Sequence, residues 1–144
     1  MSKSLKSLIR LHRWTVDERR RELGAFLARE EQLRGERRRI DDELASEKKI
    51  ATDDVMAAFG FAGYIRGYME RREMLDRAIE AAMREIEAAQ ERLAEAYRQL
   101  KTYEVTQANR DKRELAERNR AEQIVLDEVG ATLHRRRQEA EQAA

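Results

Sequence analysis

The stretch LDRAIEAAMREIEAAQERLAEAYRQL, residues 75–100, decides the fold that we expect for this chain. Its apolar residues recur at alternating steps of four and three, at Leu75, Ile79, Ala82, Ile86, Ala89, Leu93, Ala96 and Leu100. This spacing is typical of a coiled-coil helix, in which the apolar positions form a seam that faces another helix. Because the seam is unbroken and alternates small with large residues, it predicts a helix packed closely along a partner.

The first third of the chain can provide that partner. The same steps, begun near the N-terminus, give fourteen positions: Leu5, Ile9, His12, Val16, Arg19, Leu23, Phe26, Glu30, Leu33, Arg37, Ile40, Leu44, Glu47 and Ala51. Nine of these residues are apolar and five are charged or polar, so the seam is real but imperfect. Two helices with matching seams predict an all-α fold, a long antiparallel two-helix coiled-coil hairpin.

The chain can reverse its direction only between Thr52 and Gly67. Polar residues that can cap a helix N-terminus and glycines that add backbone freedom gather there: Thr52, Asp53, Asp54, Gly60, Gly63 and Gly67. We therefore expect one domain over residues 1–144. Its helices are expected at about 4–51 and about 64–138, with the turn region at about 52–63.

The second helix is expected to overhang the first. Pairing Ala51 with Tyr64 places Leu5 opposite about Arg110, so that later residues project past the start of the first helix. The apolar spacing slips after Leu100 through a stutter, and the next seam is Leu115, Asn119, Glu122, Leu126, Val129 and Leu133. Residues 107–123 are almost wholly polar, and the overhang then has an apolar set of Ile124, Val125, Leu126, Val129 and Leu133. An apolar stripe with no partner in its own chain predicts a partner outside it.

Charge and composition limit the classes of partner. Lys and Arg number 30 and Asp and Glu number 29, and the two signs are interspersed. Such a chain has no net field to attract nucleic acid or an anionic membrane. The N-terminus lacks an apolar stretch of signal-peptide length, and the longest run without charge, residues 55–65, is too short to span a membrane. We expect a cytoplasmic protein that touches membranes only through partners.

The sequence predicts no catalytic, cofactor or metal site. His12 and His134 lie far apart; His12 falls on the seam, and His134 belongs to a basic run near the C-terminus. Residues 60–67 are glycine-rich but lack the preceding strand and the Gly-Lys-Ser/Thr of a phosphate loop. The basic runs are flanked by acids and have no interleaved aromatic residues, so no nucleic-acid site is expected. We expect a protein that is not an enzyme.

Four aromatic residues, Phe59, Phe61, Tyr64 and Tyr68, lie at the expected hairpin end. A narrow two-helix end has little volume in which to bury four rings. Two interpretations remain open. The rings form a small cap that closes the turn, or they form a docking surface, since Tyr is enriched in binding hot spots.

The whole chain resembles the flagellar FliJ family, a small coiled-coil component of the flagellar type III export apparatus. Two early stretches carry the resemblance: Leu5-Lys-Ser-Leu8-Ile9-Arg-Leu11 with Glu18-Arg-Arg-Arg-Glu22-Leu23, and Tyr64-Ile-Arg-Gly-Tyr68 with Leu75-Asp-Arg-Ala78-Ile79-Glu80. The last stretch is the most telling: Glu114-Leu-Ala-Glu-Arg118-Asn119-Arg120-Ala-Glu122-Gln123, followed by Leu126-Asp127-Glu128. It is similar to the family's terminal pattern of Glu-Asn-Arg-x-(Asp/Glu)-Gln and then (Leu/Met)-Asp-Glu.

The resemblance implies a stalk similar to the central coiled coil of rotary ATPases. Its helical termini would bind the hexameric export ATPase, and its other end would meet the membrane export gate. Export chaperones would be handed on to the gate, and no nucleotide would be bound. The residues implied for gate binding are Tyr64, Tyr68, Leu75, Ala78 and Ala82. The residues implied for ATPase binding are Arg118, Asn119, Glu122, Gln123, Leu126, Val129 and Leu133.

Three other hypotheses fit the sequence. One is the equivalent stalk of a virulence type III secretion system, which has the same architecture. Another is a structural coiled-coil adaptor that homodimerises through the apolar faces left over on a two-helix hairpin. A third is a chaperone that binds export substrates directly.

Overall fold

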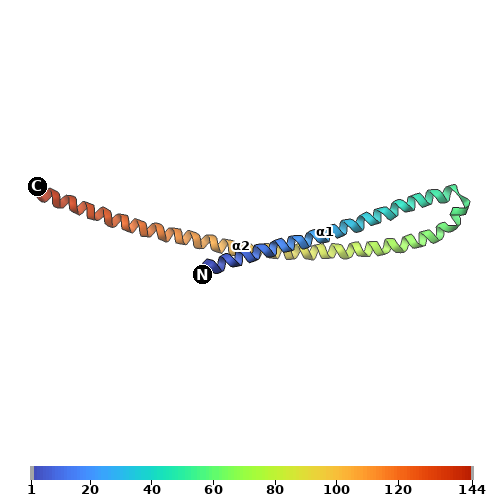
Figure 1. The fold of residues 1–144 in the computed structure, drawn as a ribbon, viewed down its shortest axis with the longest axis horizontal. Coiled ribbons are helices and arrows are strands. Elements are labelled where there is room, and N and C mark those ends of the chain that lie inside the picture. The colour runs from blue at the N-terminus through green and yellow to red at the C-terminus, as the bar shows by residue number, and fades with distance from the viewer. Residues whose placement is uncertain (1, 144) are drawn as a thin grey trace. The chain divides into compact units, whose positions relative to one another are not determined.

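The computed structural model describes residues 2–143, and their side chains from Leu5 onward. It consists of two α-helices, α1 (Ser2–Asp53) and α2 (Val55–Ala143), with no strand among the described residues. The predicted all-α helical hairpin is confirmed (Figure 1). Both helices are longer than expected, with 52 and 89 residues. No helix in the described part of the chain is long and apolar enough to cross a membrane.

The chain divides into two units, which we describe separately. The hairpin unit is Leu11–Leu100, and the terminal unit combines Met1–Arg10 with Lys101–Ala144. In the hairpin unit, α1 and α2 run side by side in opposite directions (Figure 1). In the terminal unit, the first turns of α1 pack along the part of α2 that begins at Lys101.

The predicted seams form the core. On α2, Ile79, Ala82, Ile86, Ala89, Ala96 and Leu100 are buried, and Leu75 and Leu93 are half-buried. On α1, every predicted seam position is buried or half-buried except Glu47. Ala89 is fully buried and Ile40 is only 2% exposed. The helical spacing of apolar residues therefore predicted correctly which side of each helix is covered.

Charged side chains connect the two helices across the seam of the hairpin unit. Arg92 pairs with Glu22 at 2.5 Å, and Arg37 pairs with Asp76 at 2.8 Å. Arg72 also pairs with Asp41. The partners move backward along α2 as they move forward along α1, as antiparallel pairing requires. These ion pairs and the seam set the same register, because a shift of either helix would separate the paired charges.

The reversal is sharper than expected, since Asp54 alone separates the two helices. Its backbone N–H donates to the carbonyl of Ile50 at 3.0 Å, which closes the last turn of α1. Its carbonyl accepts from the N–H of Ala58 at 3.1 Å, and its side chain accepts from the N–H of Met56 at 3.0 Å. Asp54 is therefore the N-cap of α2, and one of the three caps predicted from the sequence is confirmed.

The glycines predicted to permit the reversal do not form a turn. Gly60, Gly63 and Gly67 all lie inside α2, and no glycine among the described residues has a positive φ. The expected turn region of residues 52–63 is thus helical on both sides of Asp54, and α2 begins at Val55 rather than near Tyr64. Sequence reasoning treated the glycines as helix breakers, but glycine only lowers helix stability and does not forbid helical dihedrals.

In the terminal unit, side chains of α2 are partly buried only as far as Arg110. Leu5 and Ile9 of α1 are buried, and Tyr103, Gln107 and Arg110 of α2 are half-buried at steps of four and three. Burial thus ends at Arg110, the residue that we expected opposite Leu5. The phase slip expected directly after Leu100 is delayed, because half-buried polar side chains hold the same spacing as far as Arg110. Beyond it, residues 111–143, which we name the C-terminal arm, are exposed except for a half-buried Thr132.

Candidate functional site

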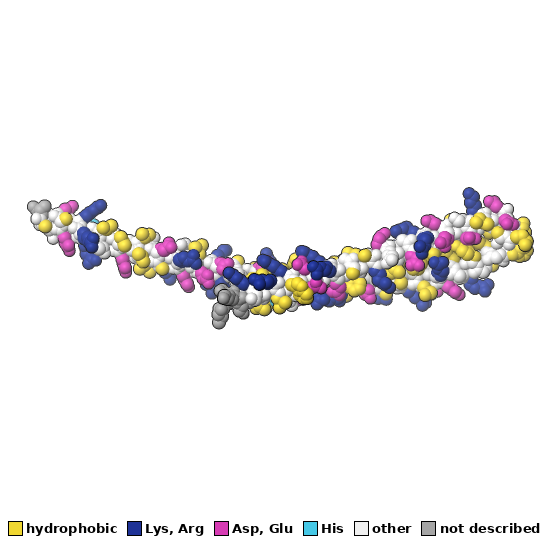
Figure 2. All heavy atoms as spheres, in the orientation of Figure 1, with side chains coloured by type: hydrophobic (Ala, Val, Ile, Leu, Met, Phe, Trp, Pro, Cys, Tyr) yellow, Lys and Arg dark blue, Asp and Glu magenta, His cyan; other side chains and the backbone are white. Residues whose placement is uncertain are grey.

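Two surfaces of the chain expose large apolar side chains close together, and each contains residues predicted to bind a partner. One lies at the end of the hairpin unit, where α1 meets α2. Val55, Met56 and Phe59 are 76%, 79% and 82% exposed there. Hydrophobic side chains gather at this end, whereas charges of both signs are interspersed along the helices (Figure 2). The other surface lies on the C-terminal arm.

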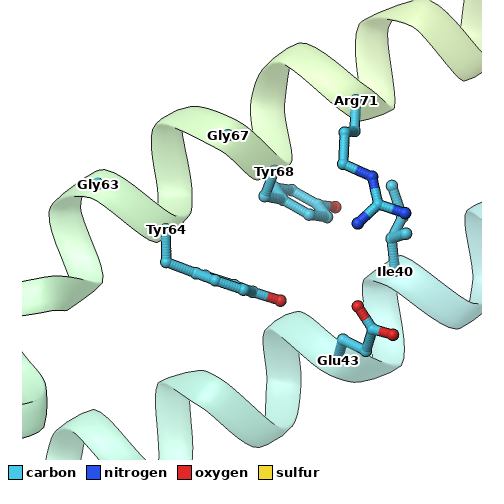
Figure 3. Close-up of a pocket in the computed structure, with 7 residues that line it drawn as sticks. All are labelled: Ile40, Glu43, Gly63, Tyr64, Gly67, Tyr68 and Arg71. Atoms are coloured by element: carbon cyan, nitrogen blue, oxygen red, sulfur yellow. The ribbon is translucent and has the colours of Figure 1, made fainter.

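A groove of about 230 Å³ lies on one side of the hairpin end. Its residues come from α1, which supplies Ile40 and Glu43, and from α2, which supplies Gly63, Tyr64, Gly67, Tyr68 and Arg71. The two tyrosine rings extend from α2 toward α1, and the Glu43 carboxylate rises from α1 toward them (Figure 3). Arg71, further along α2 than Tyr68, extends toward Ile40 of α1 (Figure 3). We call this feature the glycine groove.

Charge around the glycine groove is predominantly negative on the α1 side. Partial burial raises the pKa of the Tyr64 hydroxyl above its ordinary value, and the negative charges of Glu43 and Glu47 raise it further. The positive charge of Arg71 acts in the opposite direction. Glu43 lines the same groove as Tyr64, which accounts for its effect on the tyrosine hydroxyl.

A polar cluster beside the groove ties Tyr68 to α1. Arg72 pairs with the Asp41 carboxylate, and the Tyr68 hydroxyl donates a hydrogen bond to the same carboxylate. The hydrogen bond from Arg72, followed by that from Tyr68, lowers the pKa of Asp41. The bond to Asp41 raises the pKa of Tyr68. Tyr68 therefore contributes its ring to the groove while its hydroxyl is held within the hairpin.

The five residues predicted for gate binding occupy different environments. Tyr64 and Tyr68 meet in the glycine groove, and both are half-buried. Leu75 and Ala78 line a neighbouring groove with Glu36, Arg71 and Met74. Ala82 is only 2% exposed, because it faces α1 in the seam. Ala82 can therefore affect a partner only through the packing of the hairpin, whereas the other four border open surface.

The aromatic group is divided in the same way. Phe61 stacks on Tyr64 with ring centroids 6.3 Å apart, an arrangement that covers part of the hairpin end. Phe59 is not part of this stack and is 82% exposed. The cap interpretation therefore fits Phe61 and Tyr64, and the docking interpretation fits Phe59.

Sequence reasoning missed the α1 side of this site. Ile40 and Glu47 were recognised only as seam positions, and Glu43 was not singled out. No local signal identifies them, because their proximity to Tyr64 depends on the register of two segments that are far apart in the sequence. The register expected from pairing Ala51 with Tyr64 could have brought them together.

All seven residues predicted for ATPase binding lie on the C-terminal arm, and all are exposed. Leu126, Val129 and Leu133 are 63%, 51% and 56% exposed. The side-chain amide of Gln123 donates to the Asp127 carboxylate at 3.0 Å, one turn further along the same helix. A shallow surface depression runs beside the stripe, lined by Arg118, Ala121, Glu122, Val125 and Leu126.

Ile124 does not share the face of the other arm residues. Residues two apart point in very different directions on an α-helix, since each residue advances the side-chain direction by about 100°. Ile124 is therefore on the side opposite Leu126, although it is 53% exposed. The apolar stripe therefore consists of Leu115, Leu126, Val129 and Leu133, which are the apolar members of the expected seam, with Val125 at its edge.

The described residues contain no group of three or more His, Asp or Glu side chains that could hold a metal ion. His12 is half-buried on the seam and His134 is exposed. The structure consists of two long helices that pack along a shared heptad seam. The protein is therefore an antiparallel coiled-coil hairpin.

The sequence pattern of the family described as flagellar FliJ protein matches residues 1–139 of the 144-residue chain. The chain therefore belongs to the flagellar FliJ protein family, and this makes it a component of the flagellar type III export apparatus. The match covers all three stretches that carried the resemblance. No curated protein and no solved structure matches the chain.

Proposed function

We propose that this protein is the stalk of the flagellar export apparatus, which binds the export ATPase through the C-terminal arm and the membrane export gate through the end of the hairpin. In this role it couples ATP hydrolysis by the ATPase ring to the export of flagellar subunits. The protein itself binds no nucleotide and catalyses no reaction. Export chaperones are additional partners that it passes to the gate.

The exposure of the C-terminal arm is the observation that carries this proposal. A helix of more than thirty residues that buries none of its own large apolar side chains is poorly stabilised by itself, because isolated helices depend on packing. Leu126, Val129 and Leu133 recur at steps of three and four and therefore form one stripe. Such a stripe fits a groove or ring of another protein, which would remove it from water.

The charges of the arm also fit a protein partner. Polar side chains lie close to the stripe in sequence: Arg118, Asn119, Glu122 and Gln123. They provide one positive charge, one negative charge and two neutral amides that can donate and accept hydrogen bonds. A polar rim around an apolar centre is the usual composition of a specific protein interface. Nucleic acid would instead select a surface of uniform positive charge.

ATP hydrolysis by the cognate export ATPase tests the proposal. We expect the wild-type protein to raise the hydrolysis rate and Leu126→Arg to lose both the stimulation and the binding. Leu27→Arg provides a matched control, since Leu27 is 45% exposed and lies on α1 in the hairpin unit. It should stimulate as well as the wild type. Absence of stimulation together with absence of co-purification with the ATPase would contradict the proposal.

Self-association is the second candidate function, because the same stripe could be buried by another copy of this chain. Light scattering at micromolar concentration separates the two possibilities. A stable dimer that Leu126→Arg dissociates would support the structural adaptor, and a monomer would exclude it.

A further inference from the structure

Three glycines of α2 have no function in the fold of the chain itself. Gly60, Gly63 and Gly67 follow one another at steps of three and four and therefore lie on one face of the helix. Glycine is among the least favourable residues inside a helix. None of the three has a positive φ, and a Cβ atom added at any of them would meet nothing within 4 Å. Neither backbone conformation nor packing against α1 therefore requires glycine.

Gly63 and Gly67 do, however, leave the glycine groove open. The groove has side walls formed by the rings of Tyr64 and Tyr68, and Ile40 of α1 supplies an apolar surface (Figure 3). Its volume of about 230 Å³ is enough for one large side chain of another protein. The glycine row runs along the helix axis, so a straight element can lie along it, and small residues let a second helix approach closely.

Charge selects the kind of segment that can enter. Glu43 lines the groove on the α1 side, opposite Arg71 on the α2 side. Glu47 lies one turn further along α1, and the negative charges of Glu43 and Glu47 raise the pKa of the Tyr64 hydroxyl. Neither carboxylate forms an ion pair with any residue that the structure describes, in contrast to Asp41 on the same helix, which pairs with Arg72. A lysine or arginine on the incoming segment would complete this side of the groove.

We propose that the glycine groove binds a partner helix that inserts one large apolar side chain over Gly63 and Gly67 and places a basic side chain against Glu43 and Glu47. This inference rests on the proposed docking of the hairpin end at the export gate, and it states the chemistry of the gate segment that binds there. It also gives a function to glycines that the fold of the helix does not need.

Binding of the purified, detergent-solubilised export gate protein tests the inference. Gly67→Leu should fill the groove and weaken gate binding about tenfold or more, as expected for a residue at the centre of an interface. Gly24→Leu is the matched control, because Gly24 lies exposed on α1 with nothing within 4 Å of an added Cβ. It should bind the gate as the wild type does. Circular dichroism should report equal helicity for both variants.

The charge requirement has a separate test. The double variant Glu43→Lys, Glu47→Lys should weaken gate binding at low salt and abolish the dependence of that binding on salt concentration. Unchanged salt dependence would overturn the basic character that we assign to the partner helix.

The outcomes distinguish the inference from the function on which it rests. If Gly67→Leu binds the gate as tightly as the wild type, the glycine groove is not the docking site, although the gate function stands. If the wild-type protein does not bind the gate, both fail. Stimulation of the export ATPase by Gly67→Leu should remain at the wild-type level, because the C-terminal arm is unaltered.

Discussion

The hairpin unit and the C-terminal arm are helices of similar composition that use their apolar residues in opposite ways. Between Leu75 and Leu100 every seam residue is buried or half-buried by the other helix. Between Leu115 and Leu133 every apolar residue is exposed. Apolar residues with the same heptad-like spacing therefore stabilise the fold in the hairpin unit, whereas in the arm they remain exposed and available to a partner. A seam predicts that a helix will be covered, but it does not say by which molecule.

The largest expected effect in this comparison belongs to the hairpin seam. Ile79→Asp should lower the free energy of unfolding by about 3 kcal/mol or more, because it places an unpaired charge at a buried position. Ile79 is 3% exposed and belongs to the buried seam of α2. Thermal unfolding followed by circular dichroism measures the loss. Wild-type stability of this variant would show that the seam is not the core of the hairpin.

A smaller effect of opposite sign is expected at the glycine groove. Gly67→Ala should raise the free energy of unfolding by about 0.5–1 kcal/mol, since alanine is the better helix former. A Cβ at this position meets nothing within 4 Å, so no clash offsets the gain. Chemical denaturation of Gly67→Ala beside Gly24→Ala should give similar gains for both. Destabilisation by Gly67→Ala would mean that the fold itself requires this glycine.

Acid should weaken the hairpin through the ion pairs that cross its seam. Hydrogen bonds from Arg92 and Arg72 lower the pKa values of Glu22 and Asp41 in the folded protein. The stability from each pair is complete above the unfolded pKa of the carboxyl, about 4, and is lost as pH falls through the lower folded value. Melting temperatures should therefore drop below about pH 4, and the drop should be smaller in Asp41→Asn. An equal drop in the wild type and in Asp41→Asn would mean that other carboxylates cause the loss of stability in acid.

The smallest effect on stability is expected in the arm. Leu126→Arg should change the free energy of unfolding by less than about 0.5 kcal/mol, as is usual for an exposed position. Its helicity should match the wild type, even though it is expected to lose the ATPase. Ile124→Arg sharpens the comparison, because retained stimulation by this variant would restrict the ATPase contact to the face of Leu126. Unfolding of Leu126→Arg would show that the stripe packs within the chain.

The one-domain organisation expected over residues 1–144 remains a prediction that the same denaturation curves can test. A single cooperative transition for both units would support it, since small single domains usually unfold in one step. Separate transitions, with the arm melting first, would show that its helix depends on a partner.

The amino-acid sequence by itself determined the helices, their seams and the approximate register. These features depend on periodicity, on the lack of proline and on helix propensity, all of which act over a few turns of one chain segment. Periodicity also predicted the exposed arm, although Ile124 was assigned to the wrong face. The FliJ-like stretches identified the family for the same reason, since they are local patterns.

Only the tertiary structure decided where the chain reverses and what the hairpin end offers to a partner. Several residues could have capped α2, and the glycines could have formed a turn. The chain instead reverses at Asp54, and α2 then continues through Gly60, Gly63 and Gly67. The glycine groove exists because Ile40 and Glu43 of one helix meet Tyr64 and Tyr68 of the other. That meeting depends on contacts between segments distant in the sequence, and local propensities contain no information about such contacts.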